Sequence, residues 1–549
     1  MADIKYRYPI LLIFLGVVFF FPFLGSVPLF DWDEVNFAES AKEMLVTGDY
    51  FRVHIDFEPF TEKPPLFFWL QAASMSVFGV NEFAARFPNA LTGVIVLLIL
   101  YFIGRKLETP RFGLIWALSF WGSLLPHIYF RSGIIDPVFN LFMFLSILFL
   151  ALSVRSEKES DKNKNALWAG VFTGLAVLTK GPVGFLVVFL SFLVFWAFRR
   201  FRKLTGFRQV MVYALTVLVV SFAWYGVETI RYGPDFLRCF IIRQVEIFTT
   251  SDAGHGQPFY YHFVVLLAGC FPISFIAISN LINDRSGDYT ALRDFRIWMI
   301  SALIVVLTVF SISTTKIVHY SSVAYYPITF LAALEINRWI TNGFSIKKWI
   351  IYTGTIHTLL LSVSLLAVGL FSEYITELLP YVKDPFVAAI LTTDVEWNGS
   401  EWIPGLLFLS GSITGWFLFM KGSIIYGRVV LFCPTAVTIL LFYIMILPKV
   451  EQYTQGPYIR FFENLRGENV YVGTVGYKSY AHLYYSDKQP GQPRQMTFNE
   501  LMDAELEVPV FLSVKLTHKH RLDIHPEFEL IGREGGFLFY RKEAVVKKE

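Results

Sequence analysis

Long uninterrupted apolar runs, rather than alternating or heptad patterns, dominate the first 448 residues of this chain of 549. A membrane-spanning helix needs about 20 apolar residues, because lipid offers no partners to backbone polar groups. Thirteen such runs begin near Pro9, Arg86, Phe112, Asp136, Ala166, Gly181, Gln209, Tyr260, Ile297, Val318, Trp349, Trp402 and Val429. The pattern predicts an all-α polytopic membrane protein with about 13 transmembrane helices.

One further apolar segment, residues 66–80, is short for a span. If it lies in the membrane interface, every strongly basic loop falls on one side of the membrane, including 105–111, 155–164 and 199–208. Basic loops face the cytoplasm. We therefore predict an interfacial helix within the first outer loop, 31–85, with the N-terminus inside and the C-terminus outside.

The chain turns polar after the last run. Residues 470–475, 509–514 and 537–542 alternate apolar and polar positions, which predicts strands, and 478–486 carries a helical pattern. We predict a transmembrane domain over 1–448 and a small soluble α/β domain on the outer face over 449–549.

Composition narrows the class of protein. The chain is 55% hydrophobic and only 17% charged, against about 25% charged residues in soluble domains. This excludes a cytosolic enzyme, a disordered protein and a nucleic-acid binder. The net charge of +3 implies no polyanionic partner, and the three distant cysteines form no disulfide or metal framework.

The first outer loop differs chemically from the rest of the chain, with nine acidic and three basic residues between Asp31 and Pro65. Its segment 31-DWDE-34 opens a helix-like stretch, so its carboxylates are either ordinary helix caps or include a general base at the membrane surface. Asp31 and Asp33 also match the short D-x-D pattern of nucleotide-sugar enzymes, although they face away from the cytosolic nucleotide pool.

Glu62 and Lys63 stand directly before a Pro-Pro pair that prevents helix continuation. An anion–cation pair at this depth suits a phosphate group, with Lys63 as a point charge and Glu62 as a metal ligand or lysine partner. The alternative is a lysine that extends to the membrane surface beside its counter-ion.

Further ionisable or aromatic residues lie at the outer ends of spans, where such residues are functional candidates. They are Asp136, Lys180, Lys316, His319 and Tyr320. A topology derived from other residues places all of them on one face, which indicates a single site. His255, between two glycines in the second outer loop, is either structural or, together with Glu62, part of a divalent metal site.

The motifs resemble the bacterial GT-C glycosyltransferases related to protein O-mannosyltransferases and to the aminoarabinose transferases of lipid A. The resemblance rests on 33-DEVNFAESAKEML-45, 60-FTEKPPLFFWLQAAS-74, 131-RSGIIDPVF-139, 173-TGLAVLTKGPVGFLV-187, 254-GHGQPFYY-261 and 316-KIVHYSSVAYYP-327. It implies transfer of a sugar, with inversion, from a polyprenyl (undecaprenyl) phosphate carrier to lipid A. The site would face the periplasm from the bacterial inner membrane.

The resemblance also assigns roles. Asp33 matches the base or acceptor-orienting residue, Asp136 the second acidic position and Lys63 a catalytic contact to the lipid phosphate. Glu62 and His255 match a pair that holds a divalent metal ion, with zinc expected. The donor cavity would be lined by Lys63, Lys180, Lys316, His319, Tyr320 and Phe60.

Two positions depart from the aminoarabinose transferases. Phe60 replaces a common Tyr, and His319 replaces a Thr before Tyr320. Both changes touch the substrate cavity, so they leave the reaction class intact and the specific sugar and acceptor open. A protein O-glycosyltransferase with the same donor class therefore stays an alternative. A lipid or ion transporter is an alternative of another class, which would need polar residues through the bilayer midplane. We expect a monomer in contact with membrane lipids.

Overall fold

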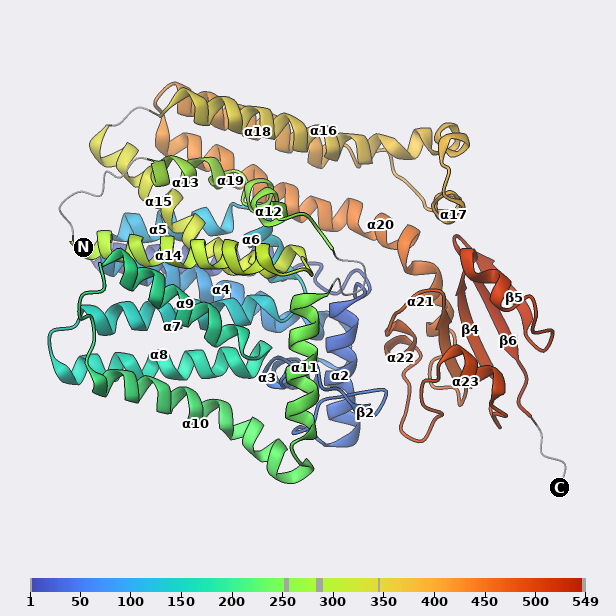
Figure 1. Ribbon diagram of the computed structural model, residues 1–549. Helices are drawn as coiled ribbons and strands as arrows, with labels where there is room; N and C mark the ends of the chain where they lie inside the picture. Colours follow the sequence, from blue (N-terminus) through green and yellow to red (C-terminus); the bar gives the residue numbers. More distant parts are fainter. Residues whose placement is uncertain (1, 251–255, 283–289, 344–345, 546–549) are drawn as a thin grey trace.

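The computed structural model describes residues 2–250, 256–282, 290–343 and 346–545. Its apolar part is a bundle of helices (Figure 1). In chain order these are α1 (Ala2–Phe20), α4 (Glu82–Leu107), α5 (Pro110–Trp121), α7 (Asp136–Arg155), α8 (Glu159–Lys180), α9 (Val183–Phe198), α10 (Phe207–Tyr232), α12 (Tyr261–Gly269), α13 (Ile273–Ile282), α14 (Thr290–Ile312), α15 (Tyr325–Asn342), α16 (Lys348–Leu378), α18 (Ile403–Met420) and α19 (Ile424–Leu441).

Each of the 13 predicted runs is helical, with α12 and α13 as two halves of one run. In the described part of the chain, seven helices are long and apolar enough to cross a membrane, or up to eight if the bent α12–α13 pair counts as one span. The other runs form helices that are shorter or more polar. The chain is thus a mostly helical, multi-pass membrane protein, and the number 13 stays a prediction.

Shorter elements connect these helices. They are α2 (Asp33–Thr47), β1 (His54–Ile55), β2 (Glu58–Pro59), α3 (Leu66–Phe78), α6 (Leu124–Ile128), η1 (Tyr129–Arg131), α11 (Asp235–Thr249), η3 (Val318–Ala324), η4 (Leu379–Tyr381) and α17 (Pro385–Leu391). The helix predicted over 66–80 is present as α3; its position in the membrane interface stays a prediction.

Close helix contacts in the bundle depend on small residues. Helices α4 and α5 pack through Gly104 and Gly113, and a Cβ on Gly113 would lie 2.2 Å from the carbonyl oxygen of Tyr101. Only glycine allows the two backbones to approach this closely, as is typical of helix pairs in membranes.

The polar C-terminal part contains a four-stranded sheet beyond one end of the bundle, whereas the N-terminus lies at the other end (Figure 1). Its elements are η5 (Phe442–Ile446), α20 (Leu447–Thr454), α21 (Gly456–Glu463), β3 (Tyr471–Val475), α22 (Ala481–Tyr485), α23 (Phe498–Asp503), β4 (Val510–Lys515), η6 (Leu516–Arg521), β5 (Glu529–Glu534) and β6 (Phe537–Lys542). The strand order is β3-β4-β6-β5, with β3 and β4 parallel and the other pairs antiparallel.

All three predicted strands and the predicted helix are present, as β3, β4, β6 and α22. Strand β5 was not predicted, because its residues are mostly exposed and lack apolar alternation. The predicted division into domains at 448/449 stays a prediction.

Buried charges join helix α2 to the C-terminal part. The Lys42 ammonium group, 1% exposed, donates to the carbonyl oxygen of Leu483 (3.1 Å) and lies 2.9 Å from the Glu39 carboxylate. Lys488 pairs with Asp56, which lies between β1 and β2. Glu43, fully buried, accepts a hydrogen bond from the amide of Phe57.

The buried Glu43 carboxyl group should make the stability of the folded chain depend on pH. Burial raises the pKa of the Glu43 carboxyl to about 9, with a further contribution from Glu39. The folded protein therefore keeps a proton that the unfolded chain releases near pH 4 to 5, so stability falls as pH rises from about 5 to about 9. We expect Glu43→Gln to flatten this fall in thermal unfolding scans of the detergent-purified protein. The exposed Glu58→Gln serves as control, and an unchanged slope in Glu43→Gln would contradict the assignment.

Candidate functional site

Three residues that are distant in the sequence meet at one end of the bundle. Asp33 begins α2, Asp136 begins α7 and His319 lies in η3. The His319 Nε2 atom is 3.5 Å from Asp33 Oδ2 and 3.8 Å from Asp136 Oδ2. The imidazole thus lies between two carboxylates, of which Asp136 is buried and Asp33 is 30% exposed at its side chain. Asp33 is the one that an incoming molecule can reach.

Lys180 completes this cluster. It is the last residue of α8, and Gly181 follows with φ +88°, a left-handed conformation that lets the chain reverse into α9. The Lys180 Nζ lies 2.6 Å from Asp136 Oδ1 and 5.1 Å from the centre of the Tyr320 ring. Lys180 therefore keeps Asp136 paired, while Tyr320 covers the ammonium group. Asp33, Asp136, Lys180, His319 and Tyr320 are called the carboxylate–histidine cluster below.

Lys63 lies beside this cluster. It is partly buried in the turn before α3, close enough for its charge to act on His319. Within the described ranges, Lys63 has no hydrogen-bond or ion-pair partner of its own. A lysine in this situation is available to an anion that enters from outside.

Glu62 has a partner that the sequence reasoning missed. Its Oε1 atom lies 2.6 Å from Nε of Arg243 in α11, and the Gln244 side chain donates to the Glu62 carbonyl oxygen. Arg243 also approaches Glu246 one turn further along α11. The signal in the sequence that could have revealed this pair is Arg243 itself, a basic residue on the amphipathic helix α11. His255, the second predicted metal ligand, lies outside the described residues. Among the described residues there is no group of three or more histidine, cysteine or carboxylate side chains that could hold a metal ion.

Two predicted donor-cavity residues make other contacts. The Lys316 ammonium group is buried and donates to the carbonyl oxygen of Ser313 at 2.5 Å. The amide of Phe60 donates to the carbonyl oxygen of Val53. In the part of the chain that the structure describes, the Lys316 ammonium group makes no hydrogen bond to the carboxylate–histidine cluster.

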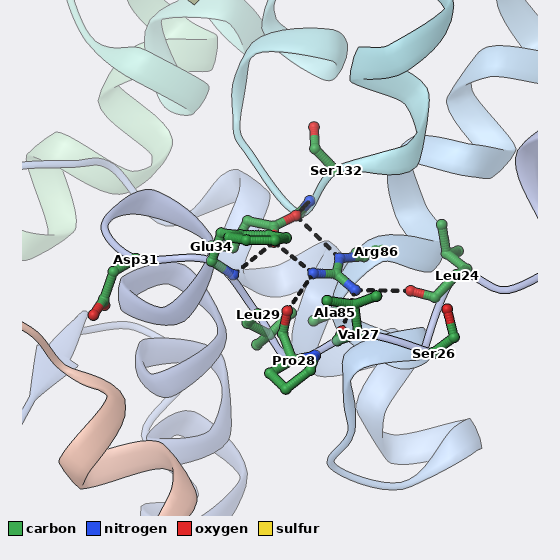
Figure 2. A network of polar contacts seen from close by, with 12 residues as sticks. Leu24, Ser26, Val27, Pro28, Leu29, Asp31, Glu34, Ala85, Arg86 and Ser132 are labelled. Atoms are coloured by element: carbon green, nitrogen blue, oxygen red, sulfur yellow. Dashed lines mark hydrogen bonds and ion pairs between the residues drawn. The ribbon is translucent and has the colours of Figure 1, made fainter. Parts of the chain in front are cut away.

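A buried ion pair anchors α2 beside Asp33 (Figure 2). The Arg86 guanidinium contacts both carboxylate oxygens of Glu34 at 3.1 and 2.7 Å and donates to the carbonyl oxygens of Leu24 and Val27. Glu34 also accepts from the amide of Gly133 at 2.5 Å, three residues before Asp136. The pair thus joins α2, α4 and the turn before α7. Burial alone would raise the pKa of the Glu34 carboxyl, but Arg86 and the amides hold it below its ordinary value.

Asp31 points away from this pair (Figure 2). It accepts hydrogen bonds from Tyr458, at 2.7 Å, and from Ser479, both in the C-terminal part. The N-cap residue of α2 is Trp32, which makes no side-chain cap. Glu34 and Asp31 hold neighbouring segments in place. For Asp33, which lies in the first turn of α2, the choice between a capping role and a general base stays open.

Known proteins share this architecture. Residues 62–224 match the family model described as dolichyl-phosphate-mannose-protein mannosyltransferase. The crystal structure of ArnT from Cupriavidus metallidurans bound to undecaprenyl phosphate superposes with a TM-score of 0.77 over 98% of both chains, at 16% identity. The chain therefore has the fold of this transferase and resembles the mannosyltransferase model over part of its length. The resemblance in the motifs is thereby confirmed.

Several curated proteins with similar sequences share one name. They include undecaprenyl phosphate-alpha-4-amino-4-deoxy-L-arabinose arabinosyl transferases of Edwardsiella ictaluri, 26% identical over 59% of each chain, and of Pseudomonas fluorescens, 31% identical over 49% of this chain and 46% of the relative. The chain spans about three-fifths of the length of the first of these relatives.

The Glu34–Arg86 pair should contribute strongly to the stability of the folded chain. Replacing Glu34 by Gln keeps the shape but leaves the Arg86 charge buried without its counter-ion, which typically costs about 3–5 kcal/mol. We expect a large drop in the thermal unfolding temperature of Glu34→Gln in detergent, whereas Asp33→Asn unfolds near the wild-type temperature. Equal unfolding temperatures for Glu34→Gln and wild type would contradict the anchoring role.

Proposed function

We propose that this protein is a glycosyltransferase that moves a sugar from an undecaprenyl phosphate carrier to an acceptor, lipid A, at the periplasmic face of the bacterial inner membrane. The observation that carries the proposal is the carboxylate–histidine cluster with Lys63 beside it, a lysine without a partner among the residues that the structure describes. The GT-C fold and the names of the curated relatives support the donor class.

The charges of the site suit this reaction. The bond between the anomeric carbon and the carrier phosphate breaks, and a bond from the anomeric carbon to the acceptor oxygen forms. The phosphate leaves with the electron pair, so it needs charge neutralisation more than a proton. Lys63 would supply a positive charge at this point.

Asp33 would act on the acceptor. Its carboxylate is partly exposed and is oriented by His319, so it would take the proton of an acceptor hydroxyl group as general base. An acceptor phosphate is already anionic, and Asp33 would then orient it without deprotonation. Because the displacement occurs in one step, the anomeric configuration inverts.

A surface cavity supports a lipid acceptor. It has a volume of about 380 Å³ and is lined by the end of α2, the start of the following loop and α3. Its walls are almost entirely apolar, with Leu45, Phe51, Trp69 and Ala72 among them. Such a cavity beside the helix predicted to lie in the interface suits acyl chains. A protein acceptor is the second candidate, and the match of residues 62–224 to a protein mannosyltransferase model favours it.

Transfer activity tests the proposal. We expect Asp33→Asn and Lys63→Ala to lower transfer from a purified undecaprenyl-phosphate sugar by about 10²-fold or more, since each removes a group that acts on the reacting atoms. The exposed Lys383→Ala, which removes the same kind of charge elsewhere, should keep wild-type activity. Full activity in either site variant would refute the mechanism. Mass spectrometry of lipid A and of envelope glycoproteins, from cells with and without the protein, identifies the acceptor.

The divalent metal ion, zinc, that the family resemblance implies is a separate proposal. Glu62 and His255 would hold this ion. Its positive charge would help to neutralise the phosphate. The described residues do not by themselves fit a metal ion, because the Glu62 carboxylate is paired with the Arg243 guanidinium.

Metal analysis of the purified protein decides this point. If the ion is present, we expect about one zinc per chain by mass spectrometry, lost in both Glu62→Ala and His255→Ala. Glu58→Ala in the same loop is the matched control. Absence of metal in the wild type, together with unchanged activity of both variants, would remove the metal ion from the proposal.

A further inference from the structure

Another cavity, partly lined by charged residues, lies at the end of the bundle opposite the candidate site. It has a volume of about 250 Å³ and lies between α7, α9 and α14, which pack against one another. Arg155, on its rim, is the last residue of α7, whereas Asp136 of the candidate site is the first. At 1.5 Å per residue, the 20 residues of this helix separate the two by about 28 Å. The cavity is therefore independent of the site described above.

The lining of the cavity carries a positive charge. Arg155, Arg199 and Lys203 contribute cations, and Asp294 is the one carboxylate among its lining residues. Arg199 lies 3.1 Å from Asp294. In the described part of the chain, Arg155 and Lys203 have neither a hydrogen-bond nor an ion-pair partner on their side chains. Two cations thus remain for an anionic ligand.

The deeper walls of the cavity are apolar. Phe195 and Trp298 stack with ring centres 4.1 Å apart, and both are 1% exposed. Outside the rim, Phe198 and Phe201 are 52% and 65% exposed beside the cationic residues. Aromatic side chains at the surface next to arginine and lysine are typical of the boundary between lipid tails and water.

We propose that this cavity binds the headgroup of an anionic phospholipid in the leaflet opposite the candidate site. Basic pockets between transmembrane helices on the cytoplasmic side are suited to such headgroups. The volume is below the 300 Å³ or so of pockets for drug-sized ligands, so it accommodates a headgroup while the acyl chains lie along the apolar helices outside. A soluble anion would make no use of the exposed Phe198 and Phe201.

Native mass spectrometry of the full chain in detergent tests this proposal, with phosphatidylglycerol and phosphatidylcholine as probes. We expect a phosphatidylglycerol adduct that phosphatidylcholine does not replace. The double variant Arg155→Gln/Lys203→Gln should weaken binding of the lipid about tenfold or more. This factor follows from the binding free energy that each basic residue near an anionic lipid typically contributes. Lys158→Gln/Arg200→Gln removes the same charge from exposed residues outside the cavity and should bind as wild type.

A second variant keeps the charges and removes the space. Ala151 lines the cavity, and we expect Ala151→Phe to weaken the adduct while all four charged side chains stay in place. The proposal would be overturned if the control pair Lys158→Gln/Arg200→Gln lost as much phosphatidylglycerol binding as the cavity pair. Equal affinity for the two lipids, or full binding by both cavity variants, would also overturn it. Displacement of the adduct by millimolar inorganic phosphate would overturn it in favour of a soluble-anion site.

Discussion

The ion pair between Glu34 and Arg86 is the contact on which the candidate site depends. Arg86 enters near the start of a long apolar helix, where an unpaired charge is costly to bury. Glu34 neutralises the Arg86 charge and also accepts a hydrogen bond from the amide of Gly133. One carboxylate thus connects α2, α4 and the turn before α7. Asp33 is the immediate neighbour of Glu34, and Asp136 follows Gly133 by three residues. The positions of both carboxylates are thereby tied to one buried contact.

The site lies where helices end, because ionisable side chains are tolerated at the ends of spans and not along their middles. Asp33, Asp136 and Lys180 are each the first or last residue of a helix. The cluster is therefore held at one end of the helix bundle, with the Asp33 side chain 30% exposed. The C-terminal part contributes to this arrangement, since Tyr458 and Ser479 bind Asp31, two residues from Asp33.

The two ends of α7 illustrate how few charges the protein uses and how distinct their environments are. At one end, Lys180 pairs with the buried Asp136 and His319 lies between two carboxylates. At the other end, Arg155 and Lys203 outnumber Asp294 around a cavity with aromatic walls. We assign the first set of charges to the proposed sugar transfer and the second to the proposed binding of an anionic lipid.

The amino-acid sequence by itself determined the class of protein, the helical runs, three of the four C-terminal strands and all five residues of the carboxylate–histidine cluster. It could do so because lipid forces every spanning segment to be apolar and helical, so hydropathy alone locates helix ends and the ionisable residues near them. Contacts between segments have no such local signal. The pairing of Glu62 with Arg243, the anchoring role of Glu34 and the exposed strand β5 were decided by the tertiary structure. They depend on which helices pack together and which charges must then find partners, and side-chain packing fixes this only in the folded chain.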